Sequence, residues 1–397
     1  MTDSIIGART GTILDIVARA WASGETPRVS TRPTVRIGSA SLIPVAIDNG
    51  NDALKGAVLD AESRLHTIRI PTAFANAEEI QGAQETTYTG EGVAYWIGET
   101  ALRHRGAALK IGPTRIRLGD DRQRLFIGAG IVELLRTAGY APGSYQIALT
   151  IAVPNTEILI ERAEDAGPEQ LTVDPATRDV LTRYLKGKVW TITREDDSRV
   201  PEQWSIRVVT ALPQAQSLGT IVAASRSPLG KRLLDLDGVT VIDIGGGDLH
   251  VCQFEFEPTR MINRRPGDGT IRIAKLLRND RAFVRLIRND VEAQQALVTR
   301  KVRRSSQMED IGEAVDRAIA TEGQAMIADV TAELRDSGYF VVITGGGVLL
   351  LNGLLTAMLG HEDKVAGKDY LLVEGRLASR LNVIGILFRL ISVATGK

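Results

Sequence analysis

The stretch VIDIGGGD (residues 241–248) indicates the fold of this chain more clearly than any other. Its apolar run ends in Asp243 and three glycines, which is typical of a buried strand that enters a tight turn. Residues 45–50, VAIDNG, repeat the pattern and again bring an Asp-x-Gly sequence to the turn. A repeat over this distance predicts a duplicated α/β domain with two facing halves.

A third apolar run, YFVVITGGG (residues 339–347), also ends in glycines, and a predicted helix, VLLLNGLLTAML, follows it. Glycine has no Cβ, so the backbone N–H groups of such turns can converge closely on an anion. A single glycine turn is common and means little. Three of them at strand ends, two with a preceding aspartate, predict an anion-binding site.

The charged residues near these turns suit a phosphate ligand with a magnesium ion. Lys55 follows Asp48 by seven residues, a distance at which a β-turn places the ammonium beside bound phosphates. Asp48 and Asp243 stand at two opposed strand ends. They can orient the water shell of Mg²⁺, which takes one or two carboxylates plus phosphate oxygens. The alternative is that both aspartates only cap their turns.

The overall composition excludes several kinds of protein and site. The 397 residues suffice for two domains of ordinary size. Lys+Arg and Asp+Glu number 48 each, so no overall field attracts nucleic acid, and direct sequence-specific nucleic-acid binding is not expected. The single cysteine, Cys252, excludes an intramolecular disulfide. No run has the length of a membrane span and no signal-peptide pattern is present, so the expected location is the cytoplasm.

Residues 1–40 read as an N-terminal extension. Residues 4–22 have the period of an amphipathic helix, and a linker with Pro27 and Pro33 follows. One interpretation makes the extension an anchor for a membrane or an adaptor protein, and the other docks it on the protein's own surface. The polar face mixes Asp15 with Arg9 and Arg19, without the basic excess of a membrane-surface helix. The basic run at residues 300–304 is interpreted as a solvated helix face.

Several of these segments resemble the actin/sugar-kinase/heat-shock-chaperone ATPase superfamily. DNGNDALK (48–55) looks like its phosphate-1 loop, DIGGGDLHV (243–251) like its phosphate-2 loop and VVITGGGVLLLNGLL (341–355) like its adenosine motif. Further segments resemble the bacterial and archaeal actin-like proteins of the ParM type: IAVPNTE (151–157), VVTALPQAQSLG (208–219), YWIGETAL (95–102) and LNVIGIL (381–387). These motifs run from about residue 42 to 391 in the family's order.

The resemblance implies a role for each matching residue. Asp48 and Asp243 would hold Mg²⁺ through water, and Glu157 would orient or deprotonate the attacking water. The nucleotide would be ATP or ADP, bound by Asp48, Asn49, Gly50, Asn51, Lys55, Gly245, Gly246, Gly247, Gly345, Gly346 and Gly347. Glu157 is also compatible with a solvated acid that starts a helix, because Asn155-Thr156-Glu157 reads as a helix N-terminus.

The match to the family has departures. Many relatives carry a hydroxyl residue where this chain has Asn51. The second loop usually has Thr or Ser after its two glycines and an Asp further on, where this chain has Gly247, Asp248 and His250. The closing motif has Ile384 where relatives often have Arg.

The expected architecture is α/β, with two duplicated ribonuclease-H-like (actin-fold) domains and a nucleotide cleft between them. Domain I would span residues 41–160, completed by the C-terminal segment 375–397, and domain II residues 161–374. The expected function is that of an actin-like cytoskeletal ATPase that polymerises with copies of itself. Two alternatives stay open: a non-polymerising ATPase linked to a membrane or partner through residues 1–40, and a small-molecule kinase of the same superfamily.

Overall fold

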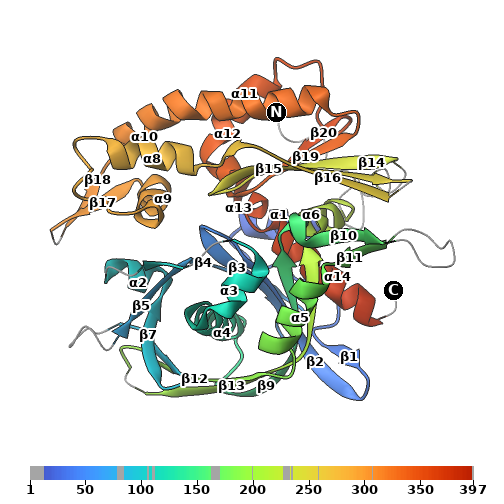
Figure 1. Cartoon of the computed structure of the whole chain (residues 1–397), viewed down its shortest axis with the longest axis vertical. Helices are drawn as coiled ribbons and strands as arrows, with labels where there is room; N and C mark the ends of the chain where they lie inside the picture. Colours follow the sequence, from blue (N-terminus) through green and yellow to red (C-terminus); the bar gives the residue numbers. More distant parts are fainter. Residues whose placement is uncertain are drawn as a thin grey trace.

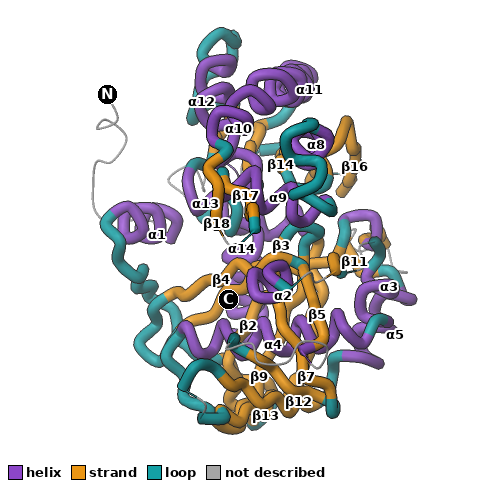
Figure 2. Tube along the Cα trace, turned by 90° about the vertical axis from the view of Figure 1, so that its left-hand side faces the viewer, coloured by secondary structure: helices purple, strands orange, loops and turns teal. Residues whose placement is uncertain are grey.

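The computed structural model of the chain describes residues 13–77, 85–104, 107–109, 112–161, 170–198, 200–226, 233, 236–257, 259–305 and 307–395. Two sheets stand one above the other in Figure 1, with helices α6 (Gln216–Ala224) and α14 (Leu381–Thr395) near the level between them. Figure 2 shows the same division from the side, with strands prevailing below and helices above.

The first sheet joins strands from the first half of the chain. Its order is β4-β3-β2-β9-β13-β12-β6-β7-β5-β8, with β1 on β2. The strands are β1 (Val35–Ile37), β2 (Ala40–Asn49), β3 (Ala53–Leu59), β4 (Leu65–Pro71), β5 (Ala73–Asn76), β6 (Thr87–Gly90), β7 (Val93–Ile97), β8 (Ala107–Ala108), β9 (Gly143–Val153), β12 (Val189–Glu195) and β13 (Glu202–Ala215). The helices on this half are α2 (Gly98–Arg103), α3 (Thr114–Gly119), α4 (Asp121–Thr137) and α5 (Pro175–Tyr184).

The second sheet has the order β16-β15-β14-β19-β20. Its strands are β14 (Gly238–Ile244), β15 (Asp248–Phe256), β16 (Thr259–Asp268), β19 (Phe340–Thr344) and β20 (Tyr370–Leu372). The helices of this half are α8 (Ile271–Asn279), α9 (Asp290–Thr299), α10 (Gly312–Ala318), α11 (Gln324–Asp336), α12 (Gly346–Leu359) and α13 (Gly375–Ala378), with a π-helical turn at Ile319–Gly323. Two short hairpins lie outside both sheets: β10–β11 (Ile158–Glu161, Gln170–Val173) and β17–β18 (Lys301–Arg304, Gln307–Asp310).

The two sheets share one topology, which confirms the predicted duplication. In the first sheet β4, β3 and β2 pair antiparallel, and β2, β9 and β13 pair parallel. In the second, β16, β15 and β14 pair antiparallel, and β14, β19 and β20 pair parallel. The VAIDNG and VIDIGGG segments are therefore the same strand of two equivalent units. Both are central and buried, as their apolar runs require.

The pairing of β13 changes one domain limit. Domain II was expected to begin at residue 161, yet β12 and β13 are strands of the first sheet, because β13 pairs with β9 over residues 204–215. Sequence pattern alone does not show which sheet a strand joins, since strand pairing is non-local. The chain passes to the second half at α6, directly after Ala215.

The basic run at residues 300–304 forms a strand and not a helix face. Helix α9 ends at Arg300, whose φ of 59° lies in the left-handed region. Residues 301–304 then pair with 307–310 as the β17–β18 hairpin. The left-handed residue reverses the chain and stops the helical period before the basic side chains begin.

The N-terminal extension docks on the protein where the structure describes it. Helix α1 (Ile13–Ala22) buries Leu14 and Val17 in the same apolar cluster as residues of α6, α13 and α14. The predicted helix started at residue 4, and its first residues lie outside the described ranges. For Ile13–Ala22 the interpretation as a segment docked on its own surface holds.

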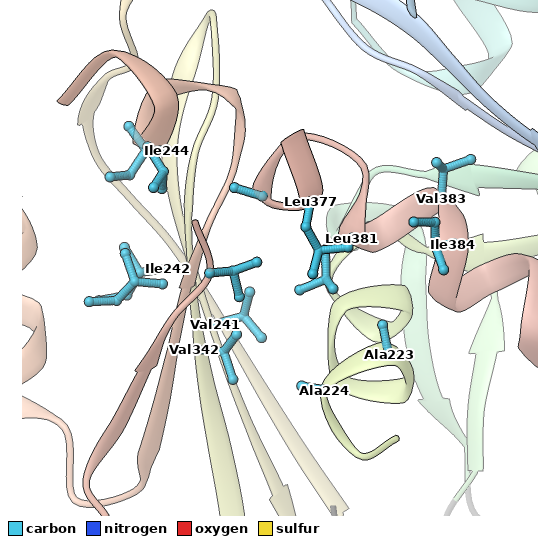
Figure 3. Packing of buried hydrophobic residues seen from close by; sticks show 14 of the residues in the cluster. Ala223, Ala224, Val241, Ile242, Ile244, Val342, Leu377, Leu381, Val383 and Ile384 are labelled. Carbon is cyan, nitrogen blue, oxygen red and sulfur yellow. The ribbon is translucent and has the colours of Figure 1, made fainter. Parts of the chain in front are cut away.

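Helices α6 and α14 cross at two glycines, and this crossing joins the two halves. A Cβ added to Gly385 would lie 1.7 Å from the carbonyl oxygen of Gly219, so no larger residue allows the same approach. Around the crossing, the small side chains of Ala223 and Ala224 pack where α6 faces Leu381 and Ile384 of α14 (Figure 3). The backbone contact therefore sets the distance between the two sheets.

We expect a Gly385→Ala substitution to destabilise the protein by about 2–3 kcal/mol, because the added methyl group must push the two helices apart. The matched control is Gly353→Ala in α12, where a Cβ meets nothing within 4 Å. That change should be neutral or stabilise by up to about 1 kcal/mol through helix propensity. Urea unfolding of both variants measures the difference, and equal free energies of unfolding would contradict the role given to the crossing.

Candidate functional site

Two equivalent hairpins bring their charged residues to the same place. In the β2–β3 hairpin Asp48 pairs with Lys55 across the strands, so both side chains lie on one face beside the turn. In the β14–β15 hairpin the equivalent pair is Asp243 and His250. The distance along the chain is seven residues in both cases. The duplication thus places two aspartates, one lysine and one histidine around a common space.

The glycines of the second turn allow the two hairpins to touch. A Cβ on Gly246 would lie 2.6 Å from the Cβ of Asp52, and one on Gly247 would lie 3.0 Å from Asn51 Nδ2. A side chain at Gly246 would force the halves apart, whereas one at Gly247 would require only the end of the Asn51 side chain to shift. Glycine is therefore required at position 246 by close approach between the domains.

The backbone of the second turn is oriented by the start of α8. The carbonyl oxygens of Gly245, Gly246 and Gly247 accept hydrogen bonds from the N–H groups of Thr270, Ile271 and Gly269, respectively. The N–H group of Gly245 closes the turn by donating to the carbonyl oxygen of Asp248, whereas those of Gly246 and Gly247 make no such backbone bond within the described part of the chain and are left for a ligand between the hairpins. Convergent amides of this kind form an anion-binding concavity.

A cavity of about 380 Å³ lies between the two halves at this point. Of the residues expected to bind phosphate or magnesium, eight line it: Asp48, Gly50, Asn51, Lys55, Asp243, Gly245, Gly246 and Gly247. Asn49 is buried beside it, and its amide nitrogen donates a hydrogen bond of 2.9 Å to Gln123 Oε1. Asn49 thus anchors the first turn to helix α4.

The carboxylates of the cavity repel one another. Burial raises the pKa of Asp243 to about 6, and the charges of Asp48 and Asp52 add to this rise while Lys55 opposes it. Burial opposes the charge of Lys55 as well, but Asp52, Asp48 and Asp243 together raise its pKa. The cavity therefore contains a charged ammonium and several carboxylates, and the ammonium alone does not neutralise them.

This donor set fits Mg²⁺. Asp48 Oδ1 is buried and has no hydrogen-bond partner among the described residues, while Asn382 Nδ2 donates to the other oxygen, Oδ2, at 3.1 Å. Asn382 thereby fixes the carboxylate and leaves one oxygen for a ligand. In the described part of the chain no group of three or more His, Cys, Asp or Glu could hold a metal unaided. Two carboxylates that share the ion with phosphate oxygens suit magnesium, which keeps most of its waters.

A second cavity, of about 330 Å³, adjoins the first and shares Asp52, Lys55 and Gly246 with it. Gly346 lines this cavity. Four apolar side chains from α9 and α12 line it as well: Leu297, Val298, Leu349 and Leu350. A ligand with a flat apolar end and a charged end would fill both cavities in succession.

The other two glycines of the third turn have spacing roles. Gly345 has a φ of 105°, and a Cβ there would lie 2.3 Å from Asp243 Oδ1. Gly347 packs against Ile244, where a Cβ would lie 2.4 Å from the Ile244 Cγ2 atom. Both glycines thus let the start of α12 approach the strand that carries Asp243.

Glu157 is buried behind the first cavity and does not line it. Its Oε1 accepts a 2.7 Å hydrogen bond from the backbone N–H of Thr114, and its Oε2 accepts one of 2.9 Å from the Thr177 hydroxyl. Its neighbours Pro154, Asn155 and Thr156 do line the cavity. The carboxylate would need to leave one of these partners to reach a water in the cavity.

Three basic residues that line the cavity are not among the ligands predicted from the sequence. Arg117 of α3 donates to the carbonyl oxygen of Asn49 and, at 2.9 Å, to Asn51 Oδ1, which ties α3 to the first turn. Arg265 of β16 stands 3.6 Å from Asp248 Oδ2. Burial lowers the pKa of His250, and Arg265 lowers it further. The repeated seven-residue spacing could have revealed His250, whereas no local pattern marks the two arginines.

Comparisons with known proteins agree with this architecture. No protein-family model and no curated protein matches the sequence. Among solved structures, the archaeal actin homolog Ta0583 superposes with a TM-score of 0.59 at 15% identity, covering 89% of this chain and 99% of its own. Bacillus thuringiensis ParM with ATP gives 0.59 at 12% identity, covering 89% and 99%. The apo psk41 ParM protein gives 0.58 at 13%, covering 88% and 98%.

Among the described helices, none is both long and apolar enough to cross a membrane.

Three observations identify the fold: the shared strand order of both sheets, the two facing hairpins and the structural neighbours. The chain has the two-domain actin-like fold found in the ParM proteins and in the archaeal actin homolog Ta0583.

Proposed function

We propose that this protein is an ATPase that binds Mg-ATP between its two halves, hydrolyses it and assembles into filaments. The observation that carries the proposal is the pair of equivalent hairpins, with Asp48, Lys55 and Asp243 around one interdomain cavity. Solved structures of two of the neighbours contain nucleotide: Ta0583 in complex with ADP and the B. thuringiensis ParM with ATP.

The residues of the cavity divide the work of binding a triphosphate. The N–H groups of Gly246 and Gly247 would bind the phosphates from the second turn, and Lys55 would neutralise their charge from the first hairpin. The N–H groups of Gly50 and Gly245 close their own turns by donating to the carbonyl oxygens of Ala53 and Asp248. Asp48 and Asp243 would hold Mg²⁺ through its water shell. The bound ion would supply further charge neutralisation at the β- and γ-phosphates. Phosphoryl transfer needs chiefly such positioning and charge stabilisation, with little covalent chemistry from the protein.

Glu157 would orient or deprotonate the attacking water. Its neighbours Pro154–Thr156 line the cavity, so a small movement of the Asn155–Glu157 turn brings the carboxylate towards it. The bond to Thr177 is the one that such a movement would break. Until nucleotide binds, this bond would hold the carboxylate away from water.

Assembly is proposed from the shared architecture of the structural neighbours. One of them, the pCBH ParM, was solved as a non-polymerisable quadruple mutant, with a TM-score of 0.59 at 15% identity. ATP would favour the closed form with both hairpins in contact, and hydrolysis would release that contact. The nucleotide state would thus control the shape that a subunit offers to the next copy.

An Asp243→Asn substitution should distinguish the contribution of Mg²⁺ to nucleotide binding from that of the protein alone. With Mg²⁺ present we expect ADP affinity to fall about 10- to 100-fold, because the amide is a poorer partner for the ion's water shell. In EDTA the variant should bind ADP as tightly as the parent or more tightly, because one carboxylate near the phosphates is gone. Titration calorimetry measures both conditions. Asp336→Asn on the exposed face of α11 is the control, and an equal loss in EDTA would contradict the metal role.

A Glu157→Ala variant should release phosphate about a hundredfold more slowly than the parent or worse, with ADP affinity unchanged. Thr177→Val removes the hydrogen bond to the same carboxylate and should not slow the reaction. Single-turnover phosphate release compares the two. If Glu157→Ala hydrolyses ATP at the parent rate, the carboxylate has only a structural role.

Sedimentation with ATP, with ADP and without nucleotide tests assembly directly. We expect a pellet that depends on ATP, and phosphate release per molecule that rises with protein concentration as subunits assemble. The absence of a pellet in every condition, together with concentration-independent release, would exclude the filament. Binding and hydrolysis of nucleotide by the single molecule would then remain as the function of the cleft.

A further inference from the structure

The second cavity contains more positive than negative side chains. Lys55, Arg69, Arg300 and Arg380 line it, against the single carboxylate of Asp52. Arg69 bonds to Asp52 at 3.1 Å, and Arg300 bonds to Asp316 at 2.6 Å. The charge of Lys55 is stabilised by Asp52, Asp48 and Asp243. Arg380 has no carboxylate within ion-pair distance in the described part of the chain, and the charges that act on it are those of Arg376 and Arg69.

The surroundings of Arg380 destabilise its positive charge. Its Nε is buried without a hydrogen-bond partner among the described residues, and its Nη1 has only a long contact of 3.4 Å with the Ser379 hydroxyl. Burial lowers the pKa of Arg380 to about 10, and the charges of Arg376 and Arg69 lower it further. A buried guanidinium with an unused donor is stabilised by a ligand that offers an acceptor or a negative charge.

The same cavity also has exposed apolar side chains. Val298 is 59% exposed and Leu349 is 49% exposed, although both line the cavity together with Leu297 and Leu350. A flat apolar group placed in the cavity would remove this surface from water. A planar base with attached ribose and phosphate combines the apolar surface and the acceptors that the cavity requires.

The ring of Trp21 lies against the guanidinium of Arg380. The Trp21 ring lies 5.9 Å from the Arg380 guanidinium carbon and 5.6 Å from that of Arg376. An aromatic face at this distance attracts a cation and restricts its orientation. The ring is itself positioned by α1, whose Leu14 and Val17 are buried in the main core.

We propose that Arg380 contacts the bound nucleotide and that Trp21 of the N-terminal helix is the positioning residue that holds it there. Helix α1 is thereby a working part of the nucleotide site. The inference rests on the proposed nucleotide binding and names a residue and a segment that contribute to it. It also gives the site a built-in reporter, since an indole stacked on a cation changes its emission when the cation moves or binds an anion.

The first test is the tryptophan emission of the full-length protein during titration with Mg-ADP. The chain has four tryptophans, and Trp21→Phe keeps an aromatic face while it removes the reporter. We expect a saturable change in the parent and the loss of most of its amplitude in Trp21→Phe. Trp190→Phe, a buried tryptophan of the first sheet, should keep the change.

The second test compares affinities for Mg-ADP by calorimetry. Arg380→Ala should bind about tenfold more weakly, the value expected for one lost charge-assisted hydrogen bond. Arg376→Ala is the matched control, because Arg376 contacts the same ring but is exposed and does not line the cavity. Trp21→Ala should weaken binding less than Arg380→Ala, and the double variant should be no weaker than Arg380→Ala alone.

The outcomes separate this inference from the proposed function. If the parent binds no nucleotide, both fail. If the parent binds Mg-ADP but Arg380→Ala binds it equally well, this inference is overturned and the ATPase proposal stands. Additive losses in the double variant would show that Trp21 acts independently of Arg380. Arg380→Lys, which keeps the charge and the stem, should recover part of the affinity and covers the case in which Arg380→Ala does not fold.

Discussion

The contact on which the rest of the structure depends is the crossing of α6 and α14 at Gly219 and Gly385. No side chain separates the two backbones there, so the crossing fixes how closely the halves approach. One turn before Gly385, α14 carries Asn382, which donates a hydrogen bond to Asp48 of the β2–β3 hairpin. One short segment therefore sets both the spacing of the domains and the orientation of a carboxylate in the cavity.

The parts of the fold and site that the sequence predicts are those encoded locally. A strand, an aspartate and a glycine turn lie within about ten residues of each other, so both hairpins and the duplication are readable from pattern. The strands that pair with β13 cannot be predicted in this way, because its pairing with β9 joins residues some sixty positions apart. Arg117 likewise reaches Asn49 and Asn51 from a distant helix. The prediction of a helix face at residues 300–304 is wrong, because a run of basic residues has no hydrophobic period that distinguishes a helix from the hairpin at 301–310.

The charges of the site show how the domains can be held together and still respond to a ligand. Asp52 stands against Gly246 of the other half and is paired with Arg69 of its own. Lys55 is drawn towards acids of both halves. A polyanion entering this space replaces carboxylates as the partner of the cations. A bound polyanion and the interdomain contact would therefore use the same side chains, so binding would change how the two halves are held together.

The position of α14 also has a consequence for synthesis of the protein. This helix packs on β2, β3 and β9 of the first sheet, which are complete by residue 153, yet its own residues begin at 381. At roughly 5–20 residues per second, the ribosome needs ten seconds or more to make the intervening chain. During that time one face of the first sheet, with Ala46, Ala57 and Leu59, has no covering helix. The nascent protein must therefore be kept from aggregating until its last helix emerges.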